Sequence, residues 1–244
     1  MRTLGLLVAC CGLMACGQED LKTGELVLHG HYDGVLTSSG IGLGIEGVVS
    51  DEGDAVFYSS SGEFFYGGVL DGTNSGEVDG LFAAYAEVTE ERTRFAVYGE
   101  RASGASAFEG AGVTRQGFSG FVSAGSGVAR LDLAFDTNKS ALGGSLAAVE
   151  GSYEGIDGGA FWRLNVSRAG VITGTDNFGC TFSGALSLPT RTNTYAIREL
   201  VMNCGGGDLV LDGVAYKESG GLGISLYGDE FIVVGNLPDA RGGT

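Results

Sequence analysis

The chain has 244 residues, with 30 Asp and Glu against 14 Lys and Arg, which gives a formal net charge of −16 at pH 7. This excess of acid argues against nucleic acid as a partner, because phosphate binding needs a basic surface, and against docking on anionic lipid headgroups. Although 46 residues are Gly, 43% are hydrophobic and only two are Pro, which excludes a disordered glycine-rich polymer.

Residues 1–16, MRTLGLLVACCGLMAC, read as an export signal. One positive charge precedes an uncharged apolar stretch that is too short to span a bilayer as a helix. The segment ends on LMAC, which resembles the lipobox of bacterial lipoproteins. The resemblance implies that Cys16 becomes the lipidated N-terminus, and Gly17 after it favours the outer membrane. An ordinary secretory signal cleaved near Ala15 is the alternative.

Cleavage after residue 15 divides the chain into an exported body and a signal. Removing residues 1–15 takes away one positive charge and no carboxylate, so 13 basic residues face 30 acids and the net charge becomes −17. We expect a lipidated tether at 16–24, a first β-barrel-like domain at 25–136, a linker at 137–150 and a second β-barrel-like domain at 151–240.

Short runs of alternating apolar and polar residues, separated by Gly, Ser, Asn and Asp, dominate the body. VARLDLAFD (128–136) and FWRLNVS (161–167) are the clearest, and this pattern is typical of strands with one dry and one wet face. A helical turn is expected only at 145–151. The first half offers strand-like runs near 26–36, 42–50, 54–60, 63–70, 77–87, 94–101, 117–124 and 127–135. The second half offers them near 151–155, 160–167, 171–176, 180–188, 194–203, 208–216, 222–227 and 230–236.

These runs predict an all-β fold. Eight antiparallel strands can close into a small barrel whose interior side chains fill the lumen, and closure removes exposed sheet edges. We therefore expect two tandem antiparallel barrel-like domains of about eight strands each. One large β-sandwich shared by both halves is the alternative.

The two halves also repeat each other in sequence. GHYDG at 30–34 returns as GSYEG at 151–155, and the segment 50–70 lies on 167–186 at an offset of 117. The offset pairs Gly53 with Gly170, Gly62 with Gly179 and Phe65 with Phe182. A period of this length is too long for a solenoid unit and favours a duplicated domain.

Three segments together carry a family resemblance: LDLAFDTNKSALGGSLAAVEGSYEG (131–155), GVITGTDNFGCTFSGALSL (170–188) and NTYAIRELVMNC (193–204). They resemble an uncharacterised group of Gly-rich, β-rich bacterial lipoproteins that share a Gly-Cys-X-Phe-X-Gly motif and a second Cys further along. The resemblance implies a β fold in the cell envelope. It implies no activity.

Cys180 and Cys204 are the only thiols left once the signal is removed and Cys16 is acylated. In an oxidising compartment they should form a disulfide. The offset of 117 places these two cysteines over Glu63 and Glu87. If the halves are duplicates, the two glutamates should therefore be neighbours in space, with their side chains splayed into solvent.

His29, His31 and Asp33 alternate along one run and would share one face of a strand. Three such groups could hold a metal ion. Leu28 and Tyr32, however, form the opposite and apolar face, so we expect the histidines to point to solvent. We predict no metal and no cofactor.

Glu199 breaks the pattern of TYAIRELVMN. Tyr195 and Ile197 alternate as an inward face that would bury the carboxylate of Glu199. A β-bulge at Arg198 and Glu199 is the alternative, because it would turn Leu200 inward instead. We expect the bulge and keep Glu199 as a candidate site residue.

No catalytic motif is present in the sequence, and Gly125-Ser126-Gly127 lacks the glycine spacing of a nucleophile elbow. We therefore expect a non-catalytic binding or structural module, anchored by lipid in the cell envelope, with an unknown protein or small molecule as partner. The alternative is a hydrolase or small-ligand carrier without a recognisable motif. A filled barrel lumen would favour the first, and a pocket with convergent polar groups and perturbed acids the second.

Overall fold

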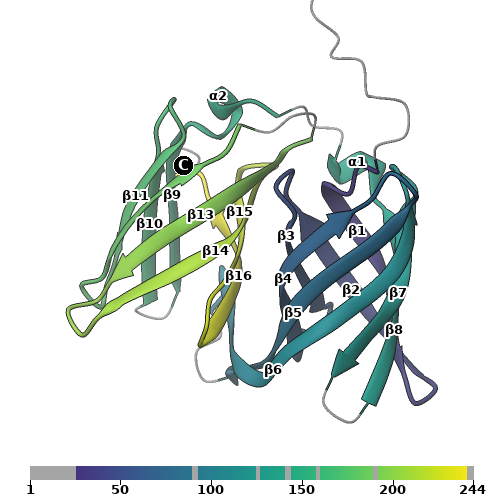
Figure 1. Cartoon of the computed structure of the whole chain (residues 1–244). Coiled ribbons are helices and arrows are strands. Elements are labelled where there is room, and N and C mark those ends of the chain that lie inside the picture. Colours follow the sequence, from purple (N-terminus) through teal and green to yellow (C-terminus); the bar gives the residue numbers. More distant parts are fainter. Residues whose placement is uncertain are drawn as a thin grey trace, which may run out of the picture.

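The computed structural model describes residues 26–89, 93–124, 127–140, 144–157, 160–188 and 192–240. Over these residues the fold is all-β, as predicted. Sixteen antiparallel strands form one continuous sheet that is rolled up twice, and two short helices connect the halves (Figure 1). The two rolls enclose separate hydrophobic cores, so the halves are barrels and do not share one sandwich core.

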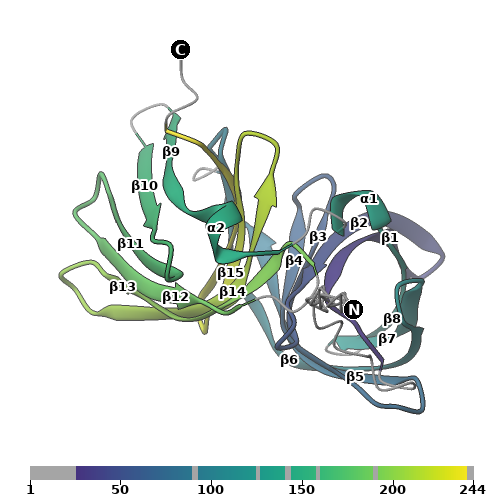
Figure 2. The same cartoon turned by 90° about the horizontal axis from the view of Figure 1, so that it is seen from above.

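The first roll is a closed barrel of eight strands, which we call barrel 1. Each strand pairs with the next along the chain, β1 pairs with β8, and β5 pairs with β6 to complete the ring seen from above in Figure 2. The strands are β1 (Gly30–Ser38), β2 (Ile41–Val49), β3 (Asp54–Ser59), β4 (Phe64–Gly72), β5 (Glu77–Glu87), β6 (Ala96–Val113), β7 (Gly117–Ala124) and β8 (Gly127–Phe135).

Apolar side chains fill the lumen of barrel 1. Phe57, Phe82, Phe108 and Phe118 meet edge to face with ring centroids 5.5–6.4 Å apart, the arrangement that aromatic quadrupoles prefer. Leu, Ile, Val and Ala side chains from seven of the strands complete this core. An eight-stranded barrel is just wide enough for such filling, and its lumen is a packed core.

The second roll, barrel 2, also has eight antiparallel strands, each paired with the next along the chain, but no ladder between β9 and β16 closes the ring in the described residues. Its strands are β9 (Gly151–Asp157), β10 (Ala160–Val166), β11 (Val171–Asp176), β12 (Thr181–Leu186), β13 (Thr194–Asn203), β14 (Asp208–Glu218), β15 (Gly221–Tyr227) and β16 (Phe231–Pro238). The end of the chain returns to β9, where Tyr153 and Asp239 form an isolated bridge and the Ala240 N–H donates to Ser152 O at 2.8 Å. Trp162, Tyr153 and Tyr195 lie in its filled lumen.

Phe95 covers the remainder of the gap between β9 and β16. Its carbonyl oxygen accepts from the Asn236 N–H at 2.7 Å, and its ring lies directly on Gly155, where an added Cβ would come 2.4 Å from Phe95 Cγ. Next to it, the Arg94 N–H donates to Asp157 Oδ2 at 2.7 Å. Gly155 is thus a glycine of close approach, because any larger residue would displace the aromatic side chain that seals the barrel.

Strand β6 belongs to both barrels. Residues 99–101 and 105–111 pair with β5 inside barrel 1, whereas the opposite edge of residues 96–100 pairs with 231–235 of β16 and carries the sheet into barrel 2. The run predicted at 94–101 is therefore only the start of a strand of 18 residues. The segment 137–150, expected as a linker, contains α1 (Thr137–Ser140) and α2 (Leu146–Val149) in its described parts.

The outer faces of the two barrels pack against each other along what we call the seam. Its apolar part brings together side chains from β2–β5 of barrel 1 and from β14 and β16 of barrel 2, namely Val48, Val56, Phe65, Tyr85, Val214, Tyr216, Ile232 and Val234. Hydrogen bonds cross the same contact: the Tyr85 hydroxyl donates to Gly228 O at 2.6 Å and the Tyr227 hydroxyl to Asp54 Oδ1 at 2.9 Å. Burial and hydrogen bonding together hold the barrels as one body.

The repeated hairpins β3–β4 and β11–β12 have the same backbone features at equivalent residues up to the turn. Gly53 and Gly170 both have positive φ, as do Gly62 and Gly179. Beyond the turn the gapless offset is wrong. The Leu70 N–H donates to Gly53 O, and the Leu186 N–H donates to Gly170 O in the same way, so these two leucines correspond at an offset of 116. The offset falls by one because the second hairpin has one residue fewer in its turn.

That one-residue difference turns the two aligned phenylalanines to opposite faces, because strand side chains alternate. Phe182 lies in the lumen of barrel 2, whereas Phe65 points out of barrel 1 into the seam. The residue of barrel 1 that corresponds to Phe182 is Tyr66, which packs against the lumen core.

Candidate functional site

The predicted lipidation residue, Cys16, lies outside the described residues. No helix in the part of the chain that the structure describes is long and apolar enough to cross a membrane.

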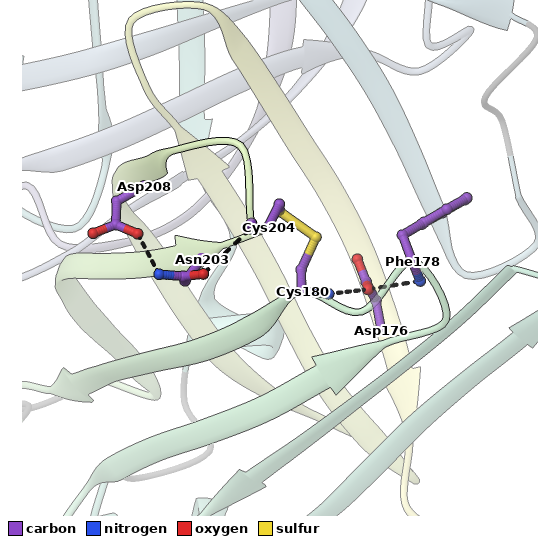
Figure 3. Close-up of a disulfide and its surroundings, with 7 residues drawn as sticks. Asp176, Phe178, Cys180, Asn203, Cys204 and Asp208 are labelled. Carbon is purple, nitrogen blue, oxygen red and sulfur yellow. Dashed lines mark hydrogen bonds between the residues drawn. A yellow bond between two sulfur atoms is a disulfide. The ribbon is translucent and has the colours of Figure 1, made fainter.

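The predicted disulfide is present. Cys180 and Cys204 are bonded with their Cα atoms 4.1 Å apart, and they join the β11–β12 turn to the β13–β14 turn at one end of barrel 2 (Figure 3). Asp176 orders the first turn, since its Oδ1 accepts from the N–H groups of Phe178 and Cys180, both at 2.8 Å. The side chain of Phe178 is 78% exposed at the tip.

The predicted bulge at Glu199 is confirmed. The register of β13 on β14 shifts between Ile197 and Leu200, and Glu199 takes a left-handed φ of 50°. Leu200 is buried in the lumen of barrel 2, while Glu199 is exposed and its N–H donates to Asp212 Oδ1 at 2.9 Å. The carboxylate of Glu199 therefore faces solvent and converges with no other candidate.

The prediction that His29 and His31 point to solvent is wrong. The two residues are 7% and 6% exposed, and His31 lies on the outer face of β1, which barrel 2 covers there. The ring of His31 stands edge-on to Tyr216, with centroids 4.7 Å apart. Burial, reinforced by the charge of Lys139, lowers the pKa of His31 to about 4.

Asp33 lies on the same face but further along β1, where the seam opens to solvent. Its Oδ1 accepts from Lys139 Nζ at 3.3 Å, and the same ammonium reaches Glu46 Oε2 at 3.4 Å. Within the described ranges no group of three or more His, Cys, Asp or Glu side chains is placed to hold a metal ion. The three residues His29, His31 and Asp33 thus form no joint site.

The seam contains a different group of polar side chains around a cavity of about 250 Å³, which we call the seam cleft. Tyr58 from β3 forms the barrel 1 side, and Tyr216 and Glu218 from β14 form the barrel 2 side. The wall is completed by residues 93–97, which include Thr93 and Arg94, and by residues 234–236 of β16. The hydroxyl of Tyr58 donates to Glu46 Oε2 at 3.3 Å, and the Asn236 amide donates to the Glu218 carboxylate.

Burial and acidic neighbours shift the pKa values of three side chains in the cleft. Burial is the main reason why the pKa values of Tyr58 and Tyr216 are raised, and the charges of Glu46 and Glu218 raise both further. Glu218 is half-buried, and its own pKa is raised mainly by burial and also by Glu46, against the opposing effect of Lys139. A cleft with several perturbed groups is the usual mark of a functional site.

A larger depression of about 510 Å³ lies on the outer face of barrel 1, over β1 and β6–β8. Gly and Ala make up five of its twelve lining residues. Its two acids are already paired, Asp33 with Lys139 and Asp132 with Arg130 at 2.8 Å. Fewer polar groups converge there than in the seam cleft, which we therefore take as the candidate site.

The sequence did not point to Tyr58 and Glu218, because the outer face of each strand was expected to be exposed to water. One signal was available in β3, where Ala55, Val56, Phe57 and Tyr58 are apolar on both faces. Strands that are buried on both faces read as continuous apolar runs. Such a run in a small barrel indicates that something covers its outside.

No family model, curated protein or solved structure matches this chain.

Proposed function

We propose that the protein is a lipid-anchored, non-catalytic binding or structural module of the bacterial cell envelope, held at the outer membrane because Gly17 follows the lipidated Cys16. The observation that carries the non-catalytic part is the filling of both lumens with side chains. A barrel without an internal cavity offers only its outer surface and its seam for recognition.

The disulfide supports the assignment to an exported compartment. Structural disulfides persist in oxidising environments, and the bridge between Cys180 and Cys204 joins two turns of barrel 2. The lipobox supports attachment through acyl chains, since two or more chains give stable anchoring where one is marginal. The net charge of −17 for the processed chain supports a partner other than nucleic acid.

The second candidate, a small-ligand carrier, is favoured by the seam cleft, whose polar groups converge from both barrels. A hydrolase lacks such support, because neither a histidine nor a cysteine lines the cleft. The carrier and the anchored module are compatible, since a lipid-held protein can bind its ligand between its barrels.

Fractionation of cells that produce the wild-type chain or Cys16→Ala tests the anchor. We expect the wild-type protein to incorporate labelled palmitate and to require detergent for release, and Cys16→Ala to incorporate none and to appear in the soluble fraction. A Cys16→Ala protein that still needs detergent would contradict lipid anchoring. Cys204→Ala, which leaves the lipobox intact, is the matched control and should remain with the membrane.

A further inference from the structure

Strand β6 has a stretch of backbone with a neighbour on one side only. On the side away from β5, β16 pairs with it as far as Glu100, and β7 pairs with it from Phe108 onward. The strand bends where it passes from one barrel to the other (Figure 1). No described residue forms a ladder on that side with residues 104–107, which we call the open edge.

The register shows which backbone groups point to the open edge. The Gly112 N–H donates to Gly76 O at 2.8 Å, next to the start of β5. Backbone groups alternate in direction along a strand, so the even-numbered residues from 106 to 112 face β5 and the odd-numbered ones face the other side. Ala105 therefore directs its N–H and its C=O, and Ala107 its N–H, to the open edge. Unpaired groups of this kind are a template for another strand.

The devices that usually protect a sheet edge are weak at this one. Residues 104–107 are Gly, Ala, Ser and Ala, without proline or charge, and all except Ser106 are exposed. The register shift of β6 on β5 lies before Ala105. Arg101 Nε donates to Ser103 O at 3.2 Å, so a side chain takes the place of a partner just before the open edge begins. The small side chains leave room for bulky residues on an added strand.

The position of the open edge selects what can pair with it. It is short and recessed, because β16 and β7 flank it on the same side of β6. In a second copy of the chain, β6 is flanked by its own β16 and β7, and these strands would collide with their counterparts before the two edges met. An extended segment without neighbours of its own fits between them.

Acidic side chains stand at the β16 end of the open edge. Glu100 is exposed opposite Phe231, and the exposed Glu230 accepts the Arg101 N–H through its carbonyl oxygen at 2.8 Å. Neither carboxylate forms an ion pair among the described residues, whereas Arg101 pairs with Asp229 at 3.5 Å. A basic residue at the end of an added segment would be attracted there, and an acidic one would be repelled.

We infer that the open edge binds an extended segment of a partner protein by strand addition, with a Lys or Arg of the partner beside Glu100 and Glu230 and β-branched residues next to Ala105 and Ala107. Backbone hydrogen bonds give such a contact its affinity, and the side chains give it specificity. This inference rests on the proposed function as a binding module and names its class of partner. It does not depend on the lipid anchor.

Fluorescence anisotropy on the purified full chain in maltoside detergent tests the site with a labelled synthetic peptide, acetyl-KVTVTVK-amide. We expect saturable binding with a dissociation constant below about 1 mM. The same peptide with N-methyl groups on its five central residues lacks the backbone donors and should bind at least about tenfold more weakly. No binding of the first peptide, or equal binding of the two, would overturn the proposal.

Two variants at one position localise the binding. Ala105→Pro removes the N–H that points to the open edge and spares the ladder with β5, so the peptide should bind at least about tenfold more weakly. Ala105→Ser keeps the N–H and is the matched control, which should bind as the wild type does. Equal affinity in Ala105→Pro and the wild type would refute the placement.

Amide exchange measured by NMR on the wild type does not require any variant to fold. Saturating peptide should slow exchange at Ala105 and Ala107, because their N–H groups become paired. Protection that appears only in other segments would also refute the placement.

Exchange of the peptide's charges tests the class of partner. The glutamate-flanked peptide acetyl-EVTVTVE-amide should bind about tenfold more weakly than the lysine-flanked one, and Glu100→Gln with Glu230→Gln should remove this preference. Asp71→Asn with Glu77→Gln removes two exposed acids elsewhere on barrel 1 and should preserve it. A preference that persists without Glu100 and Glu230 would contradict the assignment to a basic segment.

Sedimentation velocity tests the other occupant, a second copy. The wild type should be monomeric at the concentrations of the binding experiment, and a dimer that Ala105→Pro dissociates would assign the open edge to self-association and overturn the proposal. Fractionation of Cys16→Ala reports on the anchor alone, so failure of the anchor and failure of this site are distinguishable.

Discussion

Glu87 donates its backbone N–H to the carbonyl oxygen of Glu63 across 3.2 Å, in the part of barrel 1 that corresponds to the disulfide of barrel 2. The neighbourhood of the two glutamates, predicted from the repeat, is thereby confirmed. Glu63 is exposed, but Glu87 is half-buried and its Oε1 is buried, so the prediction that both side chains splay into solvent is wrong for Glu87. One barrel joins these two strands by a hydrogen bond where the other joins them by a covalent bond between Cys180 and Cys204.

This relationship predicts that Glu63→Cys with Glu87→Cys forms a second disulfide. Residues joined by a backbone hydrogen bond lie within the Cα separation of about 7 Å that bridging requires. The chain-entropy model gives a stabilisation of about 3 kcal/mol for a loop of this length. The measurement is the free energy of unfolding in urea with and without reductant. Free thiols at both positions after oxidation would contradict the prediction.

Removal of the native bridge by Cys180→Ala with Cys204→Ala should lower the free energy of unfolding by about 3 kcal/mol. Because the bridge connects two turns at one end of barrel 2, amide exchange should accelerate first around 177–180 and 204–208. Hydrogen-exchange mass spectrometry reports both effects. Wild-type protein treated with reductant is the matched control and should behave in the same way; a loss below about 1 kcal/mol would show that the unfolded chain keeps these turns together.

His31 should make stability depend on pH. Burial lowers the pKa of His31 in the folded state from 6.5 to about 4, so folding favours the neutral ring. This contribution is complete above pH 6.5, falls as the pH drops from 6.5 towards 4, and changes no further below that. The loss amounts to about 3 kcal/mol over the window.

The groups that act on His31 are Lys139, Asp136, Glu46 and Asn193, and the backbone hydrogen bond from Lys139 is the main reason why the pKa of Asp136 is lowered. His31→Gln isolates the histidine, because it cannot become charged. We expect the curve of unfolding free energy against pH to be flatter for His31→Gln than for the wild type between pH 6.5 and 4.5. Parallel curves would assign the acid sensitivity to the carboxylates.

Gly155→Ala should destabilise barrel 2. The new Cβ would lie 2.4 Å from Phe95 Cγ, so the ring that seals the gap beside β9 must move. Overpacking of this kind costs about 1–3 kcal/mol. Gly104→Ala in β6, where nothing lies within 4 Å of the added Cβ, is the control and should change little.

The same contact allows a rescue experiment. Phe95→Leu makes room for a methyl group at 155, so the double variant Gly155→Ala with Phe95→Leu should lose less free energy than the sum of the two single variants. Thermal unfolding of the four proteins measures the coupling. Strict additivity would show that Phe95 does not seal the gap.

The local alternation of apolar and polar residues was enough to predict that most of the strands exist. For β11 (171–176) and β13 (194–203) it also predicted the first and last residues correctly. The C-terminal half of β6 was not predicted. Its sequence, ASGASAFEGAGV, has small residues at most positions, so the apolar alternation that identifies a strand is weak. There the strand is specified by its neighbours β5 and β7, whose pairing is non-local.

The seam was beyond sequence reasoning for a different reason. Alternation in β1 correctly separates Tyr32 from His31, but it does not tell a face in water from a face against a second barrel. The disulfide and the bulge at Glu199 were predictable because few arrangements of two thiols, or of one carboxylate in an apolar run, satisfy the chemistry. The cleft depends on which barrel faces meet, and no local rule supplies that.

Strand β6 bears on the order in which the chain can fold. Synthesis delivers the N-terminal half first, so barrel 1 can close with β8 while the edge at 96–100 still lacks its partner. That edge is satisfied only when β16, near the end of the chain, arrives; until then its free backbone groups are open to any other strand. A neighbouring molecule at the same stage offers an identical β16, so exchange of this strand between copies competes with completion of one chain.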